Sequence, residues 1–215
     1  MFREEAIRII IAEDHIVLRQ RYAEILEPHN IITIAEAANG GEVLELLKVH
    51  EPDILLLDLN LPVINGNMIM DKLTAAYPAL KIIILSFHSS DVLVNDYISR
   101  GAKGYMPKDK ADFETLPAII RNVFNGETVY IRPENNKTDN DYSFSKRQLE
   151  IIPMIFEGLT NKEIAKETGV TERAIEKQKH QLYNKTGTQN LGSFLAYAIQ
   201  QGLHFLGRKK SSKAV

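Results

Sequence analysis

Five short apolar runs alternate with helical patterns over residues 1–126, and this alternation constrains the fold more than any other feature of the sequence. The predicted strands are Ile7–Ala12, Ile31–Ala37, Asp53–Asp58, Lys81–Ser86 and Gly104–Met106. The predicted helices are His15–Leu26, Gly41–Val49, Asn65–Ala76, Asp91–Ser99 and Ala111–Asn125. Such an alternation predicts an α/β fold, a parallel sheet wrapped by helices. The first and third runs are the most continuously apolar and are predicted to be central, whereas Pro107 favours an edge position for the fifth.

The rest of the chain shows only helical patterns. Hydrophobic periodicity vanishes around Glu134–Asp141, so residues 127–143 are predicted to be a linker between a first domain at 1–126 and a helical domain at 144–207. Helix starts are predicted where a side chain can cap the first turn, at Ser145, Thr160, Thr171 and Asn190. Residues 208–215, which are rich in Lys and Arg, are predicted to be a disordered basic tail.

Charge is divided unevenly between the two parts. The net formal charge of −2 combines +6 over residues 146–215 with −8 over the preceding residues, so the second part is a candidate for binding nucleic acid. Cysteine is absent, which excludes disulfides and thiolate metal sites. The sequence shows no apolar stretch long enough to span a bilayer and no signal-peptide pattern at its start, so we expect a cytoplasmic protein.

Acidic residues follow two of the predicted strands. Glu13 and Asp14 end the first strand, and Asp58 ends the third. A single Asp in such a place is more often a helix cap or a turn residue, but three carboxylates in one crevice repel each other and favour a divalent cation. Oxygen ligands favour Mg²⁺. A carboxylate can also act as a nucleophile and form an aspartyl phosphate, which Lys108 and Ser86, each at the end of a later strand, could hold.

These residues resemble those of a response-regulator receiver domain. The resemblance covers roughly residues 6–126 and rests on the motifs IAEDH, LLLDLNLP, ILS and GAKGYMPK. It implies a flavodoxin-like, doubly wound, five-stranded parallel sheet in the order 2-1-3-4-5. It also implies that Asp58 accepts a phosphoryl group from a histidine kinase. Asp14, Asp58 and the backbone carbonyl of Asn60 would bind Mg²⁺, with Glu13 acting through water. Ser86 and Tyr105 would form the switch pair and Lys108 would hold the phosphate.

Two residues depart from that family's pattern. Phe87 stands where receivers usually carry a small residue, and its ring is expected to restrict access to Asp58. Pro107, directly before Lys108, is expected to tilt that lysine.

The helical part contains a helix, a tight turn at Gly169 and then a basic helix, which is the helix-turn-helix arrangement. Ile164, Ala165, Ile175 and Leu182 are predicted to pack these two helices together. An ordinary helical bundle with a solvated basic face would give a similar pattern. Pro153 falls inside the first helix of this part and is predicted to kink it.

Residues 144–202 resemble the LuxR-type helix-turn-helix domain of NarL/FixJ-type response regulators, because they contain the motifs GLTNKEIA and NKTG. The resemblance implies that the second helix of the motif binds DNA and that the final helix, Leu191–Gln201, can dimerise. The DNA-binding positions implied are Thr171, Ile175, Glu176, Lys177, Gln178, Lys179 and Lys185. Gln178 and Ala174 differ from the His and Thr common in that family, and Glu176 replaces a frequent Lys.

Together these features predict a DNA-binding transcriptional response regulator of a two-component system, with a histidine kinase, double-stranded DNA and a second copy of the chain as partners. One alternative is a regulator that works without phosphorylation through protein partners. A second alternative is a Mg²⁺-dependent phosphatase of the aspartyl-phosphate class, although Asn60 stands where such enzymes usually carry a second Asp. We therefore predict that the protein is not an enzyme.

Overall fold

The computed structural model describes residues 6–64, 66–88, 90–108, 113–131 and 144–207. The chain divides into two compact units, Met1–Pro133 and Glu134–Val215. Within the described residues, no helix is both long and apolar enough to cross a membrane.

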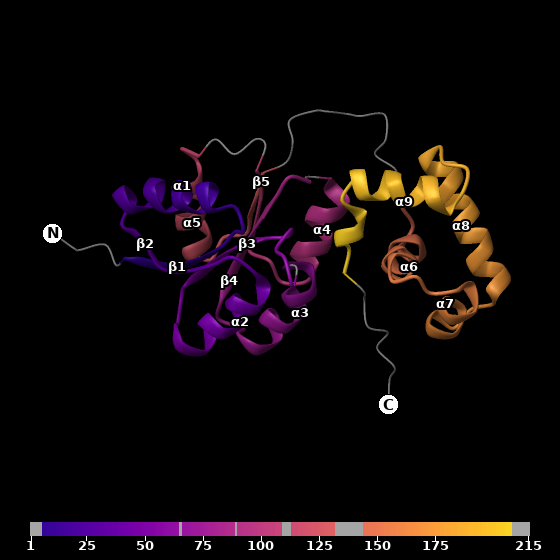
Figure 1. Cartoon of the computed structure of the whole chain (residues 1–215), viewed down its shortest axis with the longest axis horizontal. Coiled ribbons are helices and arrows are strands. Elements are labelled where there is room, and N and C mark those ends of the chain that lie inside the picture. Colours follow the sequence, from indigo (N-terminus) through magenta and orange to yellow (C-terminus); the bar gives the residue numbers. More distant parts are fainter. Residues whose placement is uncertain (1–5, 65, 89, 109–112, 132–143, 208–215) are drawn as a thin grey trace. The chain divides into compact units, whose positions relative to one another are not determined.

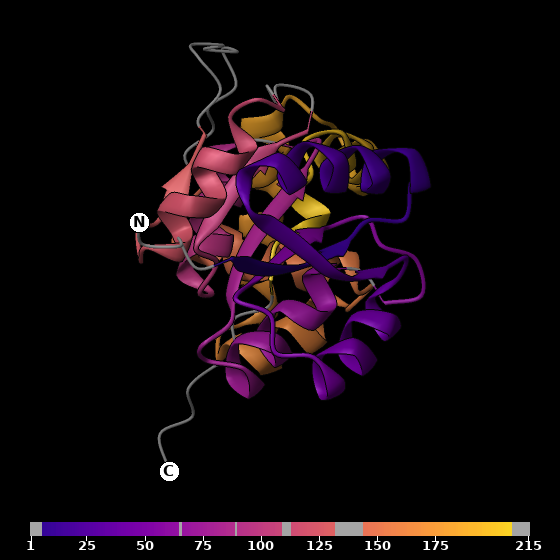
Figure 2. The same cartoon turned by 90° about the vertical axis from the view of Figure 1, so that its left-hand side faces the viewer.

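The first unit is a parallel sheet with helices on both faces. Its strands are β1 (Ile7–Ala12), β2 (Ile31–Ala37), β3 (Ile54–Asp58), β4 (Lys81–Ser86), β5 (Gly104–Pro107) and β6 (Val129–Tyr130), in the order β2-β1-β3-β4-β5-β6. Its helices are α1 (Ile16–Leu26), α2 (Gly40–Val49), α3 (Gly66–Ala76), α4 (Asp91–Ser99) and α5 (Leu116–Phe124), and a 3-10 turn, η1 (Glu27–His29), follows α1. Figures 1 and 2 show α1 and α5 on one face of the sheet and α2 and α3 on the other.

Burial follows from the position of each strand. All five residues of β3 are buried, and so are five of the six residues of β1, because each strand has a neighbour on both edges and helices on both faces. The apolar residues of one sheet face pack with those of α1 and α5 in a single core that contains Tyr22. The predicted α/β class and the order of the first five strands are therefore confirmed.

The sheet has one more strand than predicted. β6 pairs in parallel with Gly104 and Tyr105 of β5, so the residues just after 126 belong to the sheet and the predicted linker 127–143 is wrong at its start. The sequence gives little signal for a two-residue strand. The predicted edge position of the fifth strand is therefore wrong, since β5 lies between β4 and β6. Pro107 is tolerated there because it pairs with Ser86 of β4 on one side, whereas β6 pairs only with Gly104 and Tyr105 on the other. Residues 132–143 and 208–215, the rest of the linker and the tail, lie outside the described residues.

Helix α5 begins at Leu116, later than the predicted start at Ala111. Pro117 explains this difference, since proline is favoured in the first turn of a helix, where its missing N–H costs no hydrogen bond. Residues 109–112 lie outside the description.

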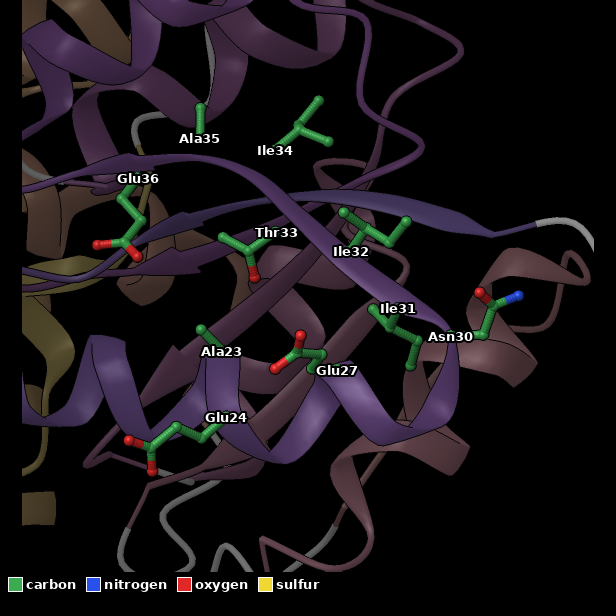
Figure 3. A pocket seen from close by; sticks show the side chains of 10 residues that line it. All are labelled: Ala23, Glu24, Glu27, Asn30, Ile31, Ile32, Thr33, Ile34, Ala35 and Glu36. Carbon is green, nitrogen blue, oxygen red and sulfur yellow. The ribbon is translucent and has the colours of Figure 1, made fainter.

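The outer edge of β2 has no neighbouring strand among the described residues, and with α1 it borders a hollow (Figure 3). The hollow is lined by Glu24, Glu27 and Glu36, and Arg19 forms an ion pair with Glu36 at 2.7 Å. Charged side chains along an edge discourage the addition of another strand. We infer that this charge protects the long edge of the sheet.

The second unit is helical. It comprises α6 (Lys146–Phe156), α7 (Asn161–Thr168), α8 (Glu172–Thr186), α9 (Leu191–Gln200) and a 3-10 turn, η2 (Leu203–Phe205). All four predicted caps are confirmed, because the side chains of Ser145, Thr160, Thr171 and Asn190 each accept a backbone N–H from the first turn. The predicted packing residues Ile164, Ala165, Ile175 and Leu182 are all buried. Helix α6 continues through Pro153, and the predicted kink there stays a prediction.

The close approach of α3 to β3 depends on Gly66. A Cβ atom at this position would lie 2.4 Å from the carbonyl oxygen of Asp58 and 3.1 Å from Cα of Leu59. Backbone atoms cannot move aside as a flexible side chain does. The first turn of α3 can therefore reach the end of β3 only without a side chain at position 66.

We expect Gly66→Ala to lower the free energy of unfolding of the first unit by about 2 kcal/mol, because the overlap displaces backbone beside Asp58. Thermal and denaturant unfolding would measure the change. Gly192→Ala in α9 is the matched control, since its Cβ would meet only Oδ1 of Asn190, at 3.4 Å. Equal stability of the Gly66→Ala protein and the wild type would contradict this account.

Candidate functional site

Three acidic side chains meet at the carboxyl ends of β1 and β3. The two strands are paired up to Ala12 and Leu57, which brings the residues that follow them side by side. Glu13 is fully buried and Asp58 is 1% exposed, whereas the Asp14 side chain is about one-third exposed. The carboxyl ends of strands in an open parallel sheet are where ligands bind, because loops diverge there.

Lys108 links two of these carboxylates. Its Nζ lies 2.5 Å from Oε2 of Glu13 and 2.8 Å from Oδ2 of Asp58. The side chain is 2% exposed, and its backbone N–H donates to the carbonyl of Ser86 at 2.7 Å, which fixes the end of β5 against β4. Pro107 does not turn this lysine away from the acidic residues. One cation therefore lies among three carboxylates, which leaves a net charge of about −2.

The remaining oxygens of the cluster fit a divalent cation. Oδ1 of Asp14 is buried and accepts no hydrogen bond, although Nδ1 of His15 lies 2.9 Å away. Oδ1 of Asp58 accepts the backbone N–H of Asn60 at 3.1 Å, which holds Asn60 beside the cluster. Hard oxygen ligands and an excess of two negative charges are what Mg²⁺ requires.

His15 is a member of this cluster that the sequence reasoning did not assign. Its Nδ1 lies 3.2 Å from Oε1 of Glu13, and ligand atoms of Glu13, Asp14 and His15 lie within 4.8 Å of one another. Its side chain is mostly exposed, so it lies at the rim. Its position in the sequence, directly after Glu13 and Asp14, was the signal that could have placed it in the cluster.

Ser86 and Tyr105 meet at the turn after β4. Ser86 Oγ accepts the backbone N–H of His88 at 3.1 Å, and the Tyr105 hydroxyl donates to the carbonyl of His88 at 2.6 Å. Burial raises the pKa of Tyr105, and its hydrogen bond with Ser86 lowers it to a smaller extent, so the phenol is protonated at neutral pH. The Tyr105 side chain is fully buried and points inward, beside Ser86.

Phe87 lies beside the acidic cluster. Its side chain is half-exposed, and its ring centroid lies 5.3 Å from Nζ of Lys108, within the range of a cation–π contact. The ring therefore covers one approach to the lysine that touches Asp58.

In the helical unit, the predicted DNA-binding residues lie along α8 and at Thr171, which caps it, and they differ in burial. Thr171, Glu176 and Lys177 are exposed, and Gln178 and Lys179 are half-buried. Ile175 is fully buried, so its assignment as a DNA contact is wrong: it packs in the core instead. Arg173, His180 and Gln181, which the sequence reasoning did not consider, are also exposed on α8, and with Lys177 their spacing follows the 3.6-residue repeat of one helix face.

Lys185 makes an internal contact. Its Nζ donates to Oε1 of Gln148 at 3.1 Å, and the same oxygen accepts the backbone N–H of Ser145. Gln148 is 2% exposed. Lys185 therefore joins the end of α8 to the cap of α6 and is set apart from the exposed row.

The geometry of both units defines a class of protein, an α/β domain with an acidic site at its strand ends followed by a helix-turn-helix domain. Residues 9–121 match the family described as response regulator receiver domain, and residues 142–198 match bacterial regulatory proteins of the luxR family. The chain belongs to the response regulators of the NarL/LuxR type, and it is a DNA-binding transcriptional regulator of a two-component system.

Relatives of known name agree with this assignment. The chain is 32% identical to oxygen regulatory protein NreC of Staphylococcus haemolyticus (strain JCSC1435) and 33% identical to NreC of Staphylococcus aureus (strain JH9), each over 91% of this chain and 98% of the relative.

Solved structures share the fold at lower identity. RcsB, in a structure of two dimers bound to two parallel DNAs, has a TM-score of 0.64 at 21% identity, over 92% of this chain and 99% of that chain. RcsB of Salmonella enterica serovar Typhimurium, bound to promoter rprA with the phosphomimetic BeF3⁻, has a TM-score of 0.61 at 20% identity, over 90% of this chain and 98% of that chain.

The two lysines Lys177 and Lys185 allow a matched test of α8. We expect Lys177→Ala to weaken binding to a mixed-sequence DNA duplex and to reduce the slope of log affinity against log salt by about one, because an exposed lysine neutralises one phosphate. We expect Lys185→Ala to lower the stability of the helical unit by about 1 kcal/mol and to leave that slope unchanged. Fluorescence anisotropy over a salt series and thermal unfolding measure both. A reduced slope only in Lys185→Ala would reverse the two assignments.

Proposed function

We propose that Asp58 is the residue of this response regulator that becomes phosphorylated, with a sensor histidine kinase as the donor. An Asp58 carboxylate oxygen attacks the phosphorus of a phosphohistidine. The new acyl–phosphate bond forms as the nitrogen–phosphorus bond breaks, and the electron pair returns to the imidazole. The observation that carries this proposal is the contact of buried Asp58 with Lys108, an ammonium already in position to hold a phosphoryl oxygen.

Asp14, Asp58 and the backbone carbonyl of Asn60 are the proposed ligands of Mg²⁺, with Glu13 acting through water. When bound, this ion offsets negative charge on the phosphoryl oxygens. The protein's own contribution is to orient the nucleophile, because Asp58 Oδ1 is held by the Asn60 amide and Oδ2 by Lys108. The Asp14 oxygen that accepts no hydrogen bond supports this ligand set.

Ser86 and Lys108 are proposed to bind the phosphoryl group after transfer. The group adds roughly two negative charges and three acceptor oxygens, to which the Ser86 hydroxyl and the Lys108 ammonium can donate. Ser86 is joined through His88 to Tyr105, so a change at Ser86 reaches β5 and the neighbouring α4. A shift of the surface formed by α4, β5 and α5 would then alter DNA binding or pairing of two chains.

Exposed apolar residues support the proposed partners. Ile16 and Val17 are 58% and 73% exposed at the start of α1, directly after the acidic cluster, and offer a contact surface for the kinase. Leu191 and Ile199 are exposed on α9, and we propose that this helix pairs two copies of the chain on DNA. The related RcsB structure, described as dimers bound to DNA, supports this proposal. We further propose that phosphate transfer serves this switch, and that the protein turns over no other substrate.

A second candidate function is regulation by protein partners without phosphorylation. Phe87 favours it, because its ring beside Lys108 narrows the approach to Asp58. Under this proposal the acidic cluster and Lys108 form a structural ion network. The two candidates predict different results for labelling with a small phosphate donor.

Wild-type protein is expected to gain one phosphoryl group from acetyl phosphate in the presence of Mg²⁺, and Asp58→Asn none, because an amide is not a nucleophile of this kind. Intact mass spectrometry measures the gain. DNA affinity of the two proteins, with and without acetyl phosphate, then tests the switch. Normal labelling of Asp58→Asn would overturn the site, and DNA affinity of the labelled protein equal to that of the unlabelled one would favour the second candidate.

Replacing Phe87 by Ala is expected to raise the rate of labelling, because it opens the approach to Asp58 and removes the ring from Lys108. The rate of mass gain at fixed acetyl phosphate is the measurement. Phe87→Leu, which keeps much of the bulk, is the control and should remain closer to wild type. An unchanged rate in Phe87→Ala would show that the ring does not restrict the site.

A further inference from the structure

A largely buried arginine, Arg100, connects the end of α4 to α3. Arg100 directly follows α4, and its side chain is 10% exposed. Its Nη1 donates to Oδ1 of Asn67 at 2.6 Å, and its Nη2 donates to the backbone carbonyl of Asn67 at 2.8 Å. Two nitrogens of one planar group thus hold one residue at the start of α3. This geometry fixes both the distance and the angle between the two helices.

The same asparagine oxygen also binds Tyr97. The Tyr97 hydroxyl donates to Oδ1 of Asn67 at 3.3 Å, and the Arg100 guanidinium lies 5.0 Å from the centre of the Tyr97 ring. Tyr97 is fully buried. Asn67 and Arg100 therefore hold this ring from its hydroxyl end and from its face.

Tyr97 in turn contacts the switch tyrosine. The ring centroids of Tyr97 and Tyr105 are 6.1 Å apart and the rings are tilted by 51°, a favourable aromatic arrangement. The Tyr105 hydroxyl is bound at its other end by the carbonyl of His88. The side chain of Tyr105 is thus confined between the turn after β4 and a ring that Arg100 and Asn67 hold in place.

We propose that Arg100 is a positioning residue of the phosphorylation switch, which acts through Asn67 and Tyr97 to keep Tyr105 in its buried position. It touches none of the residues proposed to bind phosphate. Its effect is to stabilise the buried position of Tyr105 from one side, while Ser86 stabilises the same position from the opposite side. The part of this proposal that concerns phosphate rests on the proposed function of Asp58, whereas the contacts from Arg100 to Tyr105 do not.

Nitration by tetranitromethane, mapped by peptide mass spectrometry, measures how often Tyr105 becomes accessible in the full chain. We expect Arg100→Ala to raise the nitration rate of Tyr105 about tenfold, the change that follows when charge-assisted hydrogen bonds opposing a local opening are lost. Tyr22 is the internal control, because it is about as buried but belongs to α1 and packs against Phe113, on the face of the sheet opposite α3. Its nitration should not change.

Matched variants separate positioning from charge and from folding. Asn67→Ala is expected to act like Arg100→Ala, whereas Asn67→Asp keeps the acceptor oxygen and should stay close to wild type. Arg100→Lys keeps a charge but not the two-pronged group, and should give an intermediate rate. Asp71→Ala should have little effect, because Asp71 is 57% exposed and its ion pair with Arg100 at 2.8 Å lies toward solvent.

Acetyl phosphate with Mg²⁺ completes the test. It is expected to return Tyr105 nitration in Arg100→Ala toward the wild-type rate, while the rate at which Asp58 is labelled stays within about twofold of wild type, since Arg100 does not contact that site. Unchanged Tyr105 nitration in Arg100→Ala, or an equal rise at Tyr22, would overturn the role of Arg100. If Tyr105 nitration rises in Arg100→Ala but phosphorylation of Asp58 does not lower it again, the connection to phosphate would be overturned. Absence of labelling in both wild type and variant would instead contradict the proposed function of Asp58.

Discussion

The buried ammonium group of Lys108 is the contact on which the organisation of the first unit depends. It lies between carboxylates that come from the ends of two other strands, Glu13 and Asp58. Removing a charge from water costs several kcal/mol, and two buried carboxylates without a cation between them would add mutual repulsion to that cost. The lysine makes their burial possible. It also leaves the cluster with an excess of negative charge, which is the physical reason that the site suits a divalent cation and a phosphoryl group together.

The state of this cluster can reach the protein surface because a short series of contacts leads away from it. Ser86 and Tyr105 bind the N–H and the carbonyl of the same residue, His88, so neither can move without the turn after β4. Behind Tyr105, the ring of Tyr97 is held by Asn67. Packed side chains of this kind have few alternative arrangements, so a small displacement at one end favours a discrete change at the other.

The helical unit solves a different problem, because it must expose a polar helix while keeping that helix rigid. Its rigidity comes from capped helix ends and from a core in which Ile175 and Leu182 are fully buried on the inner side of α8. The bond from Lys185 to Gln148 adds a polar contact at the end of the same helix. The outer side, with Lys177, stays exposed without contributing to the fold, as a contact between this helix and DNA would require.

Local sequence patterns were sufficient to predict the α/β class, the first five strands and the helix-turn-helix pattern. These patterns are the order of the apolar runs, the acidic residues at strand ends and the helix caps at Ser145 and Thr160. These features are local, since a period, a turn or a cap depends on residues a few positions apart. Two residues of the strand β6 carry no such signal, because their pairing with Gly104 and Tyr105 is decided by the sheet that is already there.

Burial and contact between distant residues were decided only by the tertiary structure. The sequence places Ile175 on a helix with exposed lysines, but whether that side chain faces DNA or the core depends on how α8 packs. Likewise, Arg100 and Asn67 lie 33 positions apart, and their bond exists because α3 and α4 are brought together by the sheet. Sequence alone therefore determined which elements form and which chemical groups they carry, whereas packing determined which of those groups meet.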